Sequence, residues 1–228
     1  MNVVARSLFR FYRLPALTTL GVIVVVVVVA SVVAARVARV ELSLWELITG
    51  QATKYWLLVL GLSLATQLKL HVANGVTRRR FLLGAGLFGL ITAVSFAALV
   101  PIGRGVEWLV RNALGVAANG YPDFSFGEAL RDFAHYAPGA VGWLITGALV
   151  AAGFYRYSWW AGLLLIVPFA LPLAIPETLL GLYAAVDTPV ARFLPFAAGL
   201  TLSLLASAAG AVVLRLVTRD VAIRPTAG

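Results

Sequence analysis

The chain has 228 residues, and among them are no cysteine and only two histidines, His71 and His135. The absence of cysteine excludes disulfide bonds, thiolate nucleophiles and cysteine-ligated metal sites. Two histidines are too few for a histidine-rich metal centre, and no His-Glu-x-x-His pattern occurs. We therefore expect no metal site in this protein.

Lysine is also scarce, since Lys54 and Lys69 are the only two in the chain. Neither belongs to a G-x-x-x-x-G-K-[ST] pattern, so the chain lacks the phosphate-binding loop of P-loop ATPases. No paired acidic residues fall inside an apolar run, where a membrane-embedded enzyme needs such groups near one depth. We expect no catalytic residues and no cofactor bound by this chain.

Charge is low overall. Charged residues make up 12% of the sequence, whereas about 25% is usual for a soluble domain. Hydrophobic residues make up 61%, in long runs separated by short charged clusters. A soluble core of this size cannot cover so many runs of about 20 residues, whereas a bilayer covers them directly. The composition therefore indicates a membrane protein.

The first apolar run, residues 14–35, contains no charged residue. At about 1.5 Å per residue, its helix matches the roughly 30 Å hydrocarbon core of a bilayer. Its valine-rich centre would suit a strand in water, but a lone segment in lipid must satisfy its own backbone and so favours a helix. The run is longer than the apolar part of a cleaved signal peptide, and further runs follow.

The sequence predicts an all-α bundle that crosses the membrane six times and forms a single domain. The expected spans are residues 14–35, 55–70, 81–102, 136–155, 159–176 and 193–214. With the N-terminus inside the cell, eleven of the eighteen basic residues fall on the inner side and eight of the nine acidic residues on the outer side. This asymmetry predicts that both termini are cytoplasmic. Because the basic residues flank apolar spans, we expect no nucleic-acid partner.

The longest expected loop, residues 103–135, lies outside the cell in this topology. Ser125 and Glu128 have the spacing of a capping box, which predicts a short helix over residues 126–133 leading into the fourth span. This cap either only starts the helix or also has a role beyond the local structure.

Residues 3–13 place Arg6, Arg10 and Arg13 on one helical face with apolar side chains around the rest. This pattern is typical of an interfacial helix in the cytoplasmic headgroup layer. An ordinary basic flank of the first span is the alternative.

A second basic cluster lies in the predicted cytoplasmic turn, residues 69–80. Its motif consists of Asn74, Gly75, Val76, Thr77, Arg78, Arg79 and Arg80. Gly75 allows the chain to turn, and Thr77 has the position of a helix cap. Exposed guanidinium groups suit acidic partners or lipid phosphates, although a cluster that only sets the topology would look the same.

An N-terminal amphipathic helix, six spans and a Gly-Val-Thr-Arg-Arg turn resemble the permease subunits of ABC-2 type exporters. The resemblance covers the topology of the whole chain but only about eight residues of motif. It implies that residues 3–13 form an elbow helix and that residues 69–80 form a coupling turn on the ATPase. The sequence differs from the family pattern at Thr77, where serine is commoner, and in its long loop after the third span.

The fifth span holds Pro168, Pro172 and Pro176, spaced four residues apart, with Glu177 directly after them. Prolines at this spacing break helical hydrogen bonds, and broken helices line cavities in many transporters. The segment is therefore either part of a pathway or a bent helix. Glu177 either faces a cavity or marks the outer interface. No span shows a clear central charge.

The resemblance implies the permease subunit of a bacterial inner-membrane exporter, pairing with a second permease subunit and with cytosolic ATPases that bind ATP and Mg²⁺. Membrane lipids would surround it, and the weakly charged spans favour a hydrophobic or amphipathic substrate. Two other classes stay open. One is a non-transporting assembly or sensor subunit, and the other is a small ion-coupled carrier, which should show acidic groups inside the membrane.

Overall fold

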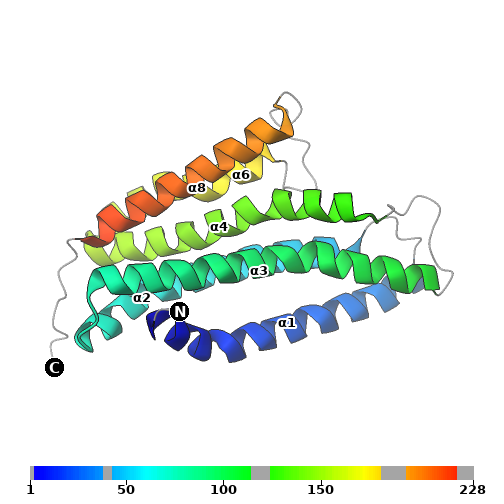
Figure 1. Ribbon diagram of the computed structural model, residues 1–228, viewed down its shortest axis with the longest axis horizontal. Helices are drawn as coiled ribbons and strands as arrows, with labels where there is room; N and C mark the ends of the chain where they lie inside the picture. The colour runs from blue at the N-terminus through cyan, green and yellow to red at the C-terminus, as the bar shows by residue number, and fades with distance from the viewer. Residues whose placement is uncertain (1–2, 38–42, 114–123, 181–193, 220–228) are drawn as a thin grey trace.

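The computed structural model describes residues 3–37, 43–113, 124–180 and 194–219 (Figure 1). In these ranges every regular element is an α-helix, which confirms the predicted fold class. The helices are α1 (Val3–Val37), α2 (Leu44–Ala73), α3 (Arg78–Ala113), α4 (Phe126–Arg156), α5 (Trp159–Phe169), α6 (Leu171–Leu179) and α8 (Phe196–Arg219).

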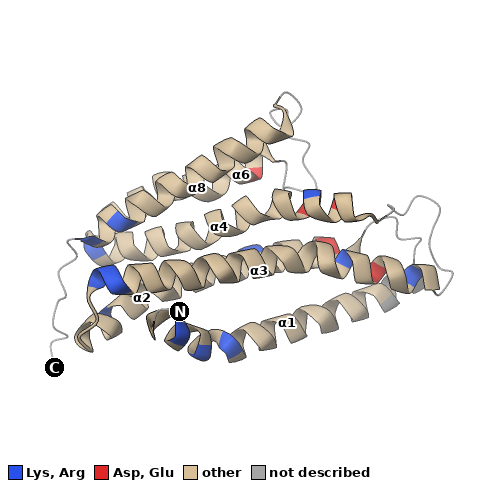
Figure 2. Ribbon diagram, viewed as in Figure 1, with Lys and Arg blue, Asp and Glu red and all other residues tan. Residues whose placement is uncertain are grey.

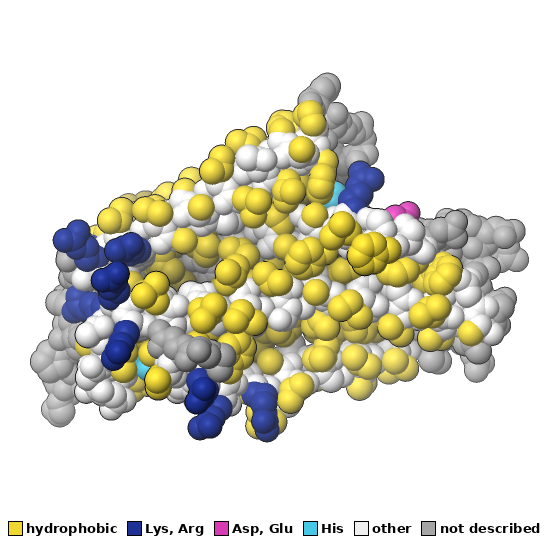
Figure 3. All heavy atoms as spheres, viewed as in Figure 1, with side chains coloured by type: hydrophobic (Ala, Val, Ile, Leu, Met, Phe, Trp, Pro, Cys, Tyr) yellow, Lys and Arg dark blue, Asp and Glu magenta, His cyan; other side chains and the backbone are white. Residues whose placement is uncertain are grey.

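Six helical stretches in the described ranges are long and apolar enough to cross a membrane, as the sequence predicts. They are α1, α2, α3, α4, the pair α5 and α6 taken together, and α8. Hydrophobic side chains cover the length of the bundle in the face shown by Figure 3, and basic side chains gather near one end. Many large apolar side chains are exposed, such as Val25 in α1 and Leu164 in α5, which is expected of a surface that lipid covers.

Helix α4 lies at the centre of the bundle, between α8 with α6 on one side and α3 with α2 on the other (Figure 1). It packs against α2, α3, α5, α6 and α8, whereas α1 packs at the edge against α3 and α2. Helix α4 is also the most buried of the six candidate spans. A movement of α6 or α8 relative to α2 and α3 would therefore change the contacts that these helices make with α4.

Two glycines allow α2 and α4 to approach closely. A methyl group on Gly61 of α2 would overlap the carbonyl oxygen of Leu144, and one on Gly147 of α4 would overlap the carbonyl oxygen of Leu58. In lipid, where water does not drive helices together, such close backbone contact is a main source of helix association. The α2–α4 pair is accordingly the rigid centre of the fold.

This packing predicts the effect of adding one methyl group. Gly61→Ala is expected to lower the free energy of unfolding by about 1–3 kcal/mol, the usual cost of overpacking a closely packed contact. Gly86→Ala in α3 is the matched control, because nothing lies within 4 Å of the added carbon. Reversible unfolding in detergent micelles measures both. Equal loss of stability in the two variants would contradict the assigned helix contact.

Several boundaries differ from the predicted ones. Helix α2 begins at Leu44 instead of residue 55, and α3 continues to Ala113 instead of ending at residue 102. The expected loop of residues 103–135 is therefore mostly helical, because α3 covers its first part and α4 its last. The capping box of Ser125 and Glu128 is confirmed, and the short helix that it starts is the first part of α4.

Helix α1 runs without interruption through residues 3–13 and the first span. Figure 1 shows a bend near its N-terminal end, and Pro15, the proline inside α1, removes one helical hydrogen bond there. The buried side of this first part packs on the bundle: Val4 contacts α3 at Gly84, and the Tyr12 hydroxyl donates to Ser63 Oγ of α2 at 2.9 Å. Protein thus covers part of the apolar surface that the sequence assigned to lipid, whereas Phe11 stays 62% exposed.

Candidate functional site

The two ends of the bundle differ in charge (Figure 2). Among the described residues, lysine and arginine gather without acidic residues at the end that holds the α2–α3 turn, whereas acidic and basic residues mix at the other end. The first end includes the start of α1, where Arg6, Arg10 and Arg13 are exposed. We call it the basic end.

The α2–α3 turn at the basic end is built by local hydrogen bonds. Gly75 has a φ of 80°, the left-handed conformation that favours glycine. The amide of Val76 donates to the carbonyl of His71 at 2.9 Å, and that of Gly75 to Val72 at 3.0 Å, a Schellman closure of α2. Thr77 Oγ1 then accepts from the Arg80 amide at 3.3 Å and caps α3, as its position predicts.

The three arginines of the turn have different surroundings. Arg78 donates from Nη1 to the carbonyl of Arg219 at 2.8 Å, which ties the start of α3 to the end of α8. Arg156 likewise donates to the carbonyls of Leu216 and Val217, so these two arginine side chains bond three of the last four carbonyls of α8. Arg79 and Arg80 are exposed, as is Asn74 before them. Two of the three guanidinium groups of the turn are therefore on residues that are exposed at the surface.

At the opposite end, Arg104 of α3 lies among three carboxylates. Its guanidinium is 2.6 Å from Asp132, 3.6 Å from Glu128 and 4.0 Å from Glu46. The Tyr136 hydroxyl also donates to Glu46 at 3.2 Å. Because these groups come from α2, α3 and α4, the cluster joins the ends of three helices.

Between the two ends lies a buried ion pair that sequence reasoning missed. Lys54 Nζ of α2 is 2.8 Å from Glu177 Oε2 of α6, and the two side chains are 6% and 1% exposed. Trp143 Nε1 of α4 donates to the other carboxylate oxygen, Oε1, at 2.7 Å. One carboxylate therefore links three helices, and its two oxygens each accept a hydrogen bond.

The position of this pair along the bundle follows from the number of residues that separate it from the basic end. Lys69 lies over the Tyr155 ring at 4.0 Å near the basic end, and Lys54 precedes Lys69 by fifteen residues, or about 22 Å of helix. Trp143 lies about 18 Å from Tyr155 along α4, whereas Asp132 lies about 34 Å from it. A hydrocarbon core of about 30 Å that begins at the level of Lys69 and Tyr155 would therefore include Lys54 and Trp143 and end near Asp132.

Two expectations are therefore wrong. The sequence placed Lys54 in an outer loop and found no charge inside a span, but α2 begins ten residues before Lys54. Of the two alternatives for Glu177, the water interface does not fit, because protein covers its side chain to 1% exposure. The sequence did contain a local signal for the earlier start of α2. Ser43 and Glu46 have the same capping spacing as Ser125 and Glu128, and Ser43 Oγ accepts from the Glu46 amide at 3.1 Å.

The prolines of the fifth span do break it. Helix α5 ends at Phe169 and α6 begins at Leu171, with Ala170 as the joint. Pro172 and Pro176 are buried, and a methyl group on Gly142 of α4 would overlap the carbonyl oxygen of Pro172. Pro168 lies in the last turn of α5. The break leaves Glu177 on a separate nine-residue helix that rests on α4.

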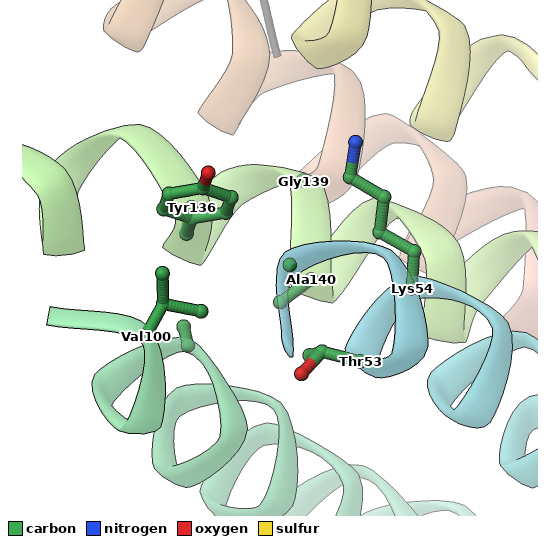
Figure 4. A pocket seen from close by; sticks show the side chains of 8 residues that line it. Thr53, Lys54, Val100, Tyr136, Gly139 and Ala140 are labelled. Carbon is green, nitrogen blue, oxygen red and sulfur yellow. The ribbon is translucent and has the colours of Figure 1, made fainter. Parts of the chain in front are cut away.

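A cavity of about 10 Å³ lies beside Lys54, between α2, α3 and α4 (Figure 4). Thr53, Val100, Tyr136 and Ala140 surround it, and the Lys54 side chain extends past α4 on one side. The buried Thr53 hydroxyl has no hydrogen-bond partner among the described residues. The space is that of about one water molecule, so this cavity does not admit a larger substrate.

Neither histidine belongs to a cluster of metal ligands. His71 Nδ1 is 3.0 Å from the carbonyl of Gln67, and His135 Nε2 is 2.7 Å from the carbonyl of Leu180. They lie near opposite ends of the bundle, and the described part of the chain contains no group of three or more metal-ligating side chains. The described charged side chains pair between helices, but they form no metal centre.

Comparisons with protein-family models, curated proteins and solved structures found no match.

Proposed function

We propose that this chain is the membrane-spanning permease subunit of an ATP-driven exporter of the ABC-2 type. It would pair with a second permease subunit and with two cytosolic ATPase subunits that bind ATP and Mg²⁺, so hydrolysis would take place outside this chain. The observation that carries the proposal is the rigid turn at the basic end, with Arg79 and Arg80 exposed on it.

The charge distribution supports an orientation for this proposal. The basic end would face the cytoplasm and the Arg104 cluster the outside, because arginine-rich ends stay on the cytoplasmic side of membranes. Both termini would then be cytoplasmic, in a bacterial inner membrane. Arg6, Arg10 and Arg13 would lie at the anionic lipid headgroups, as in an elbow helix whose apolar face packs on α3.

The contacts of the turn suggest how a motion of the ATPase would reach the bundle. Two exposed guanidinium groups would pair with acidic side chains of the partner. Arg78 connects the same turn to the end of α8, and α8 packs against α4 and α6. A displacement of the turn would therefore act on α8 and, through it, on the α6 segment next to the buried ion pair. The path that opens would carry a hydrophobic or amphipathic substrate.

The docking role predicts the result of co-purification with the cognate ATPase. Arg79→Ala combined with Arg80→Ala is expected to weaken association at least about tenfold, which corresponds to about 1.4 kcal/mol of binding free energy. Arg215→Ala is the matched control, an exposed arginine at the same end but on α8. Membrane insertion is checked first. Unchanged association and unchanged stimulation of ATP hydrolysis would remove the docking role.

A small ion-coupled carrier is the second candidate, and the Lys54–Glu177 pair favours it. Charged groups at this depth are expensive, and in membrane proteins they often belong to ion or proton pathways. Vesicle experiments separate the two mechanisms. Uptake that requires ATP and the ATPase subunits supports the exporter, whereas uptake that collapses with the proton gradient and needs no ATP supports the carrier.

A further inference from the structure

The buried carboxylate of Glu177 points to a ligand class. We propose that Lys54 and Trp143 form a carboxylate-binding site for an amphipathic substrate, and that Glu177 occupies this site while the path is closed. The substrate role rests on the proposed transport function, whereas the binding site itself rests only on the geometry.

The site has a definite donor arrangement. Lys54 Nζ donates to one carboxylate oxygen at 2.8 Å and Trp143 Nε1 to the other at 2.7 Å. These two donors match the two oxygens of a carboxylate, and the single ammonium balances one negative charge. A doubly charged phosphate ester would bring an excess of negative charge into the hydrocarbon core, which is costly. The site is therefore suited to a carboxylate monoanion.

The donors and the occupant belong to different helices. Lys54 lies within the thirty-residue α2, which is held against α4 by the Gly61 and Gly147 contacts. Trp143 lies on α4 itself. Glu177 lies on the nine-residue α6, which the break at Ala170 separates from α5. If α6 moves, the two donors stay together and only the carboxylate leaves.

The energetics of a buried charge then link this movement to binding. Separating the Lys54 ammonium from the Glu177 carboxylate inside the bundle costs several kcal/mol, so the departure of α6 from Lys54 is opposed. A carboxylate of the substrate that takes the place of Glu177 removes this cost. Opening is thus favoured by the correct ligand and opposed in its absence, which also limits leakage through an empty path.

The site is close to the lipid-facing surface, from which an amphiphile would enter. Tyr55, one residue after Lys54, is 60% exposed, and its ring contacts that of Trp143 with centroids 5.7 Å apart. A carboxylate headgroup could pass this aromatic pair while its hydrocarbon tail stays in lipid. The exposed apolar surface around α5, including Leu164 and Val167, would accommodate such a tail.

Binding of radiolabelled oleate to the purified full-length chain, in discs of zwitterionic lipid, tests the proposal. Glu177→Gln is expected to bind oleate at least tenfold more tightly than the wild type, because the competing carboxylate is gone. The double variant Lys54→Gln, Glu177→Gln should lose saturable binding, and neutral oleyl alcohol should bind to none of the proteins. Lys69→Gln, which alters the other lysine, should bind as the wild type does.

Equal oleate binding by the wild type, Glu177→Gln and the double variant would overturn the site, and so would equal binding of oleyl alcohol. If Glu177→Gln does not fold, the wild type and the uncharged double variant decide: saturable binding by the wild type alone supports the site, and equal binding overturns it. No ATPase is present in this assay, so its result is separate from that of the docking experiment.

Discussion

Replacing Lys54 with methionine is expected to lower the free energy of unfolding by about 3–5 kcal/mol, the largest single-residue effect that we predict. The reason is the carboxylate that remains. Glu177 is 1% exposed, and without Lys54 its charge would stay inside the bundle, where the Trp143 N–H donates to its Oε1. Glu177→Gln should destabilise the protein by a similar amount, because it leaves the lysine ammonium buried.

The double variant Lys54→Met, Glu177→Gln distinguishes the interaction energy of the ion pair from the cost of removing only one of its charges. It removes both charges and keeps the volume, so its stability should return to within about 1–2 kcal/mol of the wild type. Unfolding of all four proteins in the same micelles gives the double-mutant cycle. Lys69→Met serves as control, since its ammonium lies over the Tyr155 ring near the basic end.

A loss of less than about 0.5 kcal/mol in Lys54→Met would mean that water reaches the pair, because exposed ion pairs contribute little. The same stability measurements also bear on the carboxylate site. Oleate should raise the stability of Glu177→Gln, since a ligand that binds only the folded state stabilises it, and it should leave the uncharged double variant unchanged.

The second large effect is an all-or-none labelling pattern. The chain has no cysteine, so a single introduced cysteine is the only thiol present. In intact cells, a membrane-impermeant maleimide should label Phe126→Cys and leave Arg79→Cys unlabelled. In inside-out vesicles the result should reverse. The basis is that the two positions lie at opposite ends of the bundle, with the 31 residues of α4 and the 36 of α3 between those ends.

Both positions are accessible in the structure: Phe126 is 84% exposed, and Arg79 is exposed at the turn. Leu164→Cys is the internal control, because this side chain is 76% exposed but lies in the middle of the apolar α5. It should react from neither side, since lipid excludes the reagent. Labelling of Arg79→Cys and Phe126→Cys from the same side would refute the proposed topology.

The features that were predicted correctly depend on residues close together in the sequence. The apolar runs are long enough by themselves to define six helical stretches. Gly75 and Thr77 shape their turn, and Ser125 and Glu128 cap α4, through hydrogen bonds that reach no more than five residues. Local backbone preferences suffice for such features, and composition suffices for membrane character.

Long-range features could not be predicted in the same way. Arg78 looks like Arg79 and Arg80 in the sequence, but its partner is the carbonyl of Arg219, 141 residues away. The apolar face of residues 3–13 resembles a lipid-binding surface, but protein covers Leu8 and Tyr12 on it while Phe11 stays exposed. A sequence pattern shows which face is apolar, whereas only packing decides whether lipid or protein covers it.

By itself, the sequence determined the membrane environment, the all-helical class, the six apolar stretches and the basic turn, because each follows from composition or from neighbouring residues. Only the tertiary structure revealed the Lys54–Glu177 pair, whose members lie 123 residues apart. Read alone, each looks like a charge at the end of a span. The packing of α2 and α6 on the shared helix α4 places the two charges in contact inside the bundle, where the low dielectric makes each depend on the other.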